Sequence, residues 1–197
     1  MGERIEYICA LADENALVGQ TETVMQTDYY FRGEELMLTD DSGETWVASG
    51  LTTKQLEETK AVYGQGNMIP ENSVYADGNG MFAVFWGETP TLHVSKDDGE
   101  TWTDFVFQEE YPRLCTSRIV RFLDPENGYV GLGTDWSMGT GGATYIGWTH
   151  DGGATWETTP VAVENGWILS GLAFADQSAG CLRWMNNLEK IRGRMYL

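Results

Sequence analysis

An eight-residue pattern that occurs three times constrains this chain more than any other feature. Each copy reads [ST]-x-D-x-G-x-T-W, and the copies span 39–46, 95–102 and 149–156, so that successive aspartates are 56 and 54 residues apart. A motif that returns at a nearly constant spacing indicates a fold built from repeated structural units. A single continuous β-sandwich is the weaker alternative, because it would not be expected to repeat one turn in phase.

The residue types of this octet are those of a tight turn between two strands. The Asp carboxylate can accept hydrogen bonds from N–H groups of its own loop, the Gly can take a positive φ, and the Trp is a large apolar anchor. Catalysis would not need the same carboxylate three times in one frame, so we expect a structural role. The residues expected to have it are Asp41, Gly43, Thr45, Trp46, Asp97, Gly99, Thr101, Trp102, Asp151, Gly153, Thr155 and Trp156.

A second, weaker pattern lies between the octets. Residues 122–130 and 174–180 share Phe, Asp and Gly at an offset of 52 residues, and shorter versions begin at Asp13 and Asp77. Each lies between two apolar stretches, which predicts a strand, a turn and a second strand. Together with the octets, these turns give four strands per unit and a period of 47 to 64 residues, which is typical of a propeller blade.

We therefore predict an all-β chain that forms one domain, a β-propeller with three full four-stranded blades and a partial fourth. The expected boundaries are about 4–50, 72–108, 115–163 and 167–197, with an insertion at about 51–71 in which residues 52–58 predict a short helix with a Thr cap. Propellers typically have four to eight blades. We expect either a fragment of a longer protein, a ring completed by a second copy, or closure by residues 5–11.

The composition limits the kinds of ligand that the chain is expected to bind. It has 12 Lys and Arg against 30 Asp and Glu, a formal charge of −18, which argues against nucleic acid as a ligand because phosphate affinity depends on cations. Its longest apolar run, 81–86, is far too short to cross a bilayer, and no basic-then-apolar leader opens the chain. We expect no membrane insertion.

No cofactor or metal site is expected. The three cysteines, Cys9, Cys115 and Cys181, contain no C-x-x-C pair, so neither a zinc site nor a disulfide framework is indicated. The two histidines, His93 and His150, are 57 residues apart and lie beside or within octets.

The octets resemble the Asp-box repeat of bacterial neuraminidases, sialidases and related β-propellers. The F-x-D-x-x-x-G turn is similar to that of photosystem II assembly-factor-like propellers. The resemblance implies that the octets join the two outer strands of each blade, on the face opposite an active site. It also implies an extracytoplasmic or secreted location, with a cytoplasmic location as the alternative. The F/Y-R-I-P stretch that usually carries the first sialidase arginine has no counterpart here, so the resemblance assigns no catalytic residue.

The opposite face of such a propeller would collect the segments most suited to binding. They are the loops expected at 26–32 and 133–142 and the link around 109–113, where aromatic rings lie beside carboxylates and guanidinium groups, as a sugar site requires. The candidate ligand-binding residues are Tyr29, Tyr30, Arg32, Tyr111, Arg113, Asp135 and Trp136. These aromatic side chains could instead only cover the rims of neighbouring blades.

Three functions follow. The favoured one is a sialidase-like propeller module without chemistry of its own that binds a glycan or a protein. The alternatives are a sialidase-like exo-glycosidase and a protein assembly factor.

Overall fold

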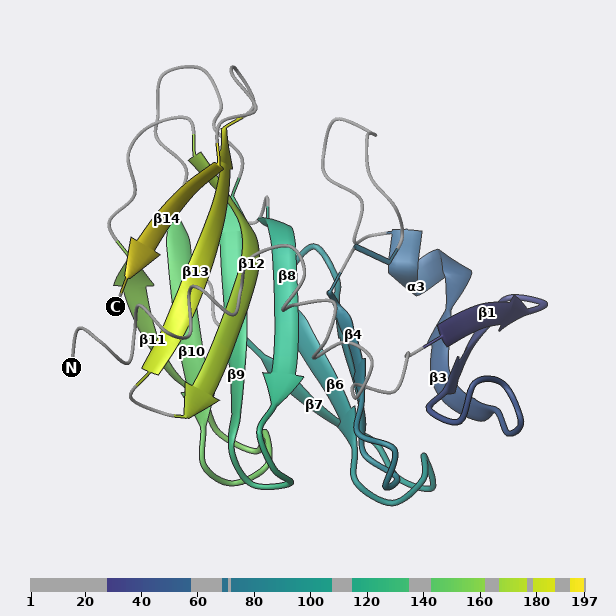
Figure 1. Ribbon diagram of the computed structural model, residues 1–197. Coiled ribbons are helices and arrows are strands. Elements are labelled where there is room, and N and C mark those ends of the chain that lie inside the picture. The colour runs from purple at the N-terminus through teal and green to yellow at the C-terminus, as the bar shows by residue number, and fades with distance from the viewer. Residues whose placement is uncertain are drawn as a thin grey trace.

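The protein is almost entirely β-structure. The computed structural model describes residues 28–57, 69–70, 72–107, 115–134, 143–161, 167–176, 179–186 and 192–196, which form four antiparallel sheets (Figure 1). The prediction of an all-β chain is thereby confirmed. No helix in these segments is long and apolar enough to cross a membrane.

The sheets follow one another along the chain. The first contains β1 (Asp28–Arg32), β2 (Glu35–Thr39) and β3 (Val47–Thr52) and is followed by α3 (Thr53–Glu57). The second contains β4 (Val74–Ala76), β5 (Phe82–Trp86), β6 (Thr91–Ser95) and β7 (Thr103–Val106). The third contains β8 (Cys115–Phe122), β9 (Gly128–Thr134), β10 (Thr144–Thr149) and β11 (Glu157–Val161). The fourth contains β12 (Trp167–Asp176), β13 (Ala179–Asn186) and β14 (Arg192–Tyr196).

Each octet forms the turn between two paired strands, joining β2 to β3, β6 to β7 and β10 to β11. The turns that follow β4 and β8 lie at the same end of the molecule, the lower end in Figure 1. Backbone hydrogen bonds tie the two kinds of turn together, from Asp98 N to Gly80 O (3.0 Å) and from Gly152 N to Glu126 O (2.8 Å). This end is therefore a network of turns bonded to one another.

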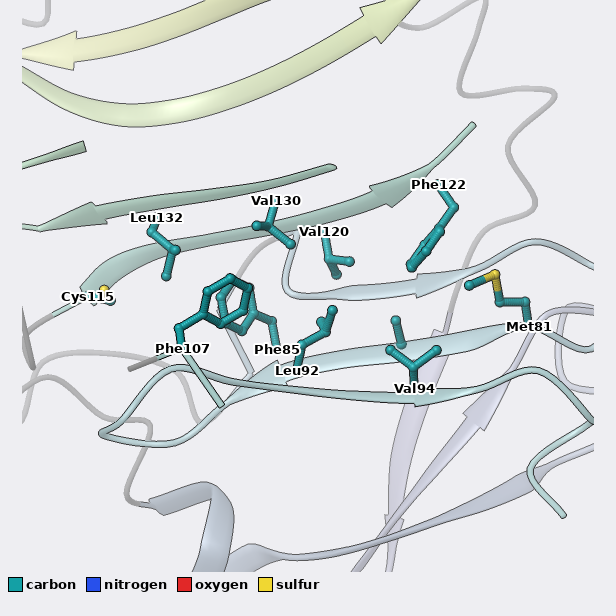
Figure 2. Packing of buried hydrophobic residues seen from close by; sticks show 11 residues of the cluster. Met81, Phe85, Leu92, Val94, Phe107, Cys115, Val120, Phe122, Val130 and Leu132 are labelled. Carbon is teal, nitrogen blue, oxygen red and sulfur yellow. The ribbon is translucent and has the colours of Figure 1, made fainter. Parts of the chain in front are cut away.

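The sheets stack face to face, and a separate apolar cluster fills each of the three interfaces. The cluster between the first two sheets contains Leu36, Leu38, Leu51, Leu56, Ile69, Ala76, Phe82 and Val84. The cluster between the second and third sheets, where the side chains point toward one another (Figure 2), contains Met81, Ala83, Phe85, Leu92, Val94, Phe107, Cys115, Val120, Phe122, Val130 and Leu132. The cluster between the third and fourth contains Ile119, Tyr129, Ile146, Leu169, Leu172, Leu182 and Trp184. Each core therefore belongs to two sheets, as in a stack of repeats.

The helix expected after the first sheet is confirmed as α3. Thr52 and Gln55 form a capping box, in which the Gln55 side-chain oxygen accepts from Thr52 N at 3.1 Å and Gln55 N donates to Thr52 Oγ1 at 3.4 Å. The buried Leu56 anchors the helix in the first inter-sheet cluster.

One expectation was wrong. The segment 26–32 is not a loop, because Asp28–Arg32 is strand β1 and pairs in full register with β2. Consecutive aromatic residues favour a strand, and Gly33, at φ 68°, allows the tight two-residue turn that brings the chain back.

Candidate functional site

The three octets fold in the same way. In each, the Asp carboxylate accepts a hydrogen bond from the backbone N–H of the Thr four residues later at 2.9 Å and from its hydroxyl at 2.6 Å. The hydroxyl of the first octet residue, Thr39, Ser95 or Thr149, donates to the same carboxylate at 2.7 to 2.9 Å. The bonding capacity of these carboxylates is thus used within their own turns.

These hydrogen bonds favour the ionised carboxylate. The side-chain and backbone bonds from Thr155 lower the pKa of Asp151 from its usual 3.8 to about 2. Equivalent bonds from Thr45 and Thr101 lower the pKa of Asp41 and Asp97. A carboxylate held ionised by its own loop is a poor proton donor near neutral pH.

The octet tryptophans differ in what they pack against. In all three, the indole N–H donates to the carbonyl of the octet glycine at 3.0 to 3.1 Å. The Trp102 ring packs on the cluster between the first two sheets, and the Trp156 ring on the cluster between the second and third. Trp46 instead contacts Tyr30 edge-to-face, with ring centroids 4.4 Å apart.

The sequence-predicted residues of β1 lie at the surface of the first sheet. Tyr29 is 43% exposed and Tyr30 is 39% exposed, and they lie on opposite faces of the sheet, with Tyr30 beside Trp46. We call these three residues, which flank β1 on both faces, the first-sheet aromatic surface. Arg32, at the end of β1, makes a surface ion pair with Glu35 at 3.3 Å. The other four predicted binding residues, Tyr111, Arg113, Asp135 and Trp136, lie outside the described residues.

Two arginines of β8 bind carbonyl oxygens. Arg118, only 2% exposed, donates from Nη1 to Cys115 O (2.6 Å) and from Nη2 to Gly87 O (2.7 Å). Arg121 donates to the backbone and side-chain oxygens of Asn72, at 3.2 and 2.7 Å. Burial lowers the pKa of both arginines and raises the pKa of the Cys115 thiol to about 11. The cations thereby link the third sheet to the second.

His93 links the first two sheets. Its Nε2 lies 2.8 Å from Ser49 O and its Nδ1 lies 2.5 Å from Asp104 Oδ1. The imidazole stacks on Trp102, with ring centroids 4.4 Å apart and planes inclined by 3°. Because a carbonyl oxygen can only accept, Nε2 is the donor to Ser49. In the described part of the chain, no group of three or more His, Cys, Asp or Glu side chains could hold a metal ion.

The hairpin of β1 and β2 had a signal in the sequence that pointed to it. Residues 31–34 read F-R-G-E and residues 85–88 read F-W-G-E, and in both copies the Gly follows a strand and has a positive φ. The second copy lies in a clearly apolar strand, so aligning the two copies would have placed β1 correctly.

Comparison with known proteins gives one similar solved structure to report. No family model matches the chain, and no curated protein matches it. The chain is similar to a structure described as "YCF48 bound to D1 peptide", with 17% sequence identity and a TM-score of 0.42. The similarity covers 88% of this chain and 53% of the other, so this chain spans about half the length of that protein.

Proposed function

We propose that this chain is a non-catalytic module that binds a polypeptide through the first-sheet aromatic surface. We also propose that its four sheets are blades of an Asp-box β-propeller, the second to fourth of them within the boundaries expected from the sequence. The observation that carries the binding proposal is the environment of Trp46, which differs from that of the two equivalent tryptophans.

In the second and third sheets, the octet tryptophan fills space between two sheets. In the first sheet it contacts Tyr30, and both Tyr29 and Tyr30 remain exposed. Tyrosine and tryptophan are enriched in protein interfaces, because each offers a large rigid apolar area with a polar tip. Such a surface supports a polypeptide as the ligand.

The polar groups of the described residues give less support to a glycosidase. The octet carboxylates are bound within their own turns. The guanidinium groups of Arg118 and Arg121 are directed at carbonyl oxygens of neighbouring segments. A sugar carboxylate would need guanidinium groups directed at it instead.

Selection from a peptide display library, followed by fluorescence anisotropy with the purified full chain, tests this function. We expect the double variant Tyr29→Ser/Tyr30→Ser to bind selected peptides at least about tenfold more weakly, as expected for the loss of two aromatic contacts. Val106→Ser is the matched control, because Val106 is an exposed apolar residue, 50% accessible, on β7.

Circular dichroism verifies that both variants are folded. Failure to select any peptide, or equal weakening by the Val106 control, would overturn the proposal. Hydrolysis of a fluorogenic sialoside by the pure chain would show that the module is catalytic.

A further inference from the structure

In the described residues, the β1 edge of the first sheet differs from the corresponding part of the next two sheets. In the second sheet, β5 pairs with β6 along one edge and with β4 along the other. In the third sheet, β9 pairs in the same way with β10 and β8. β1 is the equivalent strand of the first sheet, because the octet follows the next strand along the chain in all three. Among the residues that the structure describes, β1 pairs only with β2.

The hairpin geometry identifies the groups on the second edge of β1. A two-residue loop, Gly33 and Glu34, joins paired residues Arg32 and Glu35, with the positive φ at the first loop position, as in a type II′ turn. In such a hairpin the pair next to the loop exchanges both hydrogen bonds, and alternate pairs do so along the ladder. The backbone N–H and C=O groups of Tyr29 and Phe31 therefore point away from β2.

Side chains flank this edge on both faces of the sheet. Successive residues of a strand alternate between faces, so Tyr29 and Tyr30 lie on opposite sides. Both rings are exposed. A strand added beside β1 would meet an aromatic side chain on each face while its backbone bonds to this second edge, which is how extended peptides bind sheet edges.

Charge selects among the possible occupants of this edge. The chain carries a formal charge of −18, and its residues 1–27 contain five Asp and Glu against one Arg. The N-terminal segment and a second copy of the chain would thus both bring like charge to an acidic molecule. Glu34, exposed at the tip of the hairpin, adds a carboxylate close to the edge. Charge complementarity favours a basic partner.

We propose that an extended, Lys- or Arg-containing segment of a partner protein adds to β1 as a further strand, hydrogen-bonded to the backbone of Tyr29 and Phe31. This inference rests on the proposed function and specifies the chemistry of the partner and its mode of binding. The added strand takes the position beside β1 that β4 and β8 take beside β5 and β9.

Backbone N-methylation of a selected peptide tests the mode of binding. In an edge-bound strand only alternate N–H groups face the neighbouring strand. We expect methylation of one alternate set of residues to weaken binding to the full chain at least about tenfold, and methylation of the other set to change it less than about threefold, because each lost backbone hydrogen bond is costly.

Two measurements test the charge of the partner. Affinity for a selected peptide is expected to fall at least about threefold between 50 and 300 mM salt, because salt screens exposed charges. Glu34→Lys is expected to weaken binding. Glu88→Lys is the matched control, since Glu88 is an exposed glutamate at the same place in the F-x-G-E sequence of the second sheet.

The outcomes separate this inference from the proposed function. If selected peptides bind and the Tyr29/Tyr30 variant weakens them, but both methylated sets bind alike, strand addition is wrong and the proposed function stands. If no peptide is selected, both fail. Selection of acidic peptides, or displacement by a peptide with the sequence of residues 5–11, would overturn the basic partner.

Discussion

At the scale of single residues, position 2 of the octet shows how the same place in a repeat can carry side chains of opposite charge. Lys96 occupies it in the second sheet, and its Nζ donates to Asp151 O of the next octet at 3.0 Å. Asp40 occupies it in the first sheet, where burial and the charges of Asp41, Asp77 and Asp98 raise its pKa. The lysine joins neighbouring octets, whereas the aspartate adds repulsion between them.

Asp40→Lys is therefore expected to stabilise the protein, by about 0.5 kcal/mol, the size of an exposed charge contact. The raised pKa of the Asp40 carboxyl means that ionising this group destabilises the folded protein. Stability is therefore lost as the pH rises above 3.8, the usual pKa of Asp, and through the higher pKa of Asp40 in the folded state. Urea unfolding should accordingly show a larger gain at pH 7 than at pH 3.5. Asp40→Asn is the control, because it removes the charge without adding a cation. If Asp40→Lys is no more stable than Asp40→Asn, the lysine makes no new contact between octets.

At the scale of turns and strands, the octet was predictable because its geometry is local. The hydrogen bonds to the Asp151 carboxylate come from Thr149 and Thr155, both within four positions, so composition and spacing suffice to anticipate them. Strand β1 was not recognised because its aromatic run lacks an alternating pattern, and its assignment depends on pairing with β2. The carbonyl partners of Arg118 and Arg121 include residues 31 and 49 positions away, beyond the reach of any local pattern.

The octet carboxylates should make the protein sensitive to acid. Their lowered pKa values mean that the stabilisation is present above pH 3.8 and lost as pH falls toward their folded values, about 2 for Asp151. We expect Asp151→Asn to lower the urea midpoint at pH 6 and to approach the wild-type midpoint at pH 2.5. Glu157→Gln, which removes an exposed carboxylate from β11, is the control. A constant difference between the two pH values would refute this explanation.

At the scale of the whole molecule, the described sheets do not all have the same support. The second and third sheets contribute to two apolar clusters each, and the first and fourth contribute to one each. In stacks of repeats, stability is approximately the sum of each unit and its contacts with its neighbours. Units at the ends of such a stack therefore open more readily than those in the middle.

Hydrogen exchange measured by mass spectrometry should reveal this gradient. We expect the slowest exchange in β5, β6 and β9. Faster exchange is expected in β2, β3 and β13, since among the described residues the first and fourth sheets each contribute to one apolar cluster. Addition of a peptide selected for binding to the first-sheet aromatic surface should slow exchange in β2. Uniform protection across all four sheets would show that they open as one cooperative unit.

The octet turns also divide the molecule into an end that is constant and an end that varies. All three octet connections have the same length, with seven residues between the flanking strands. At the other end, the connections from β1 to β2, β5 to β6 and β9 to β10 have two, four and nine residues. Mutation and insertion can therefore diversify one end while the other preserves the architecture, which makes such a fold readily evolvable and suits it to the grafting of new recognition loops.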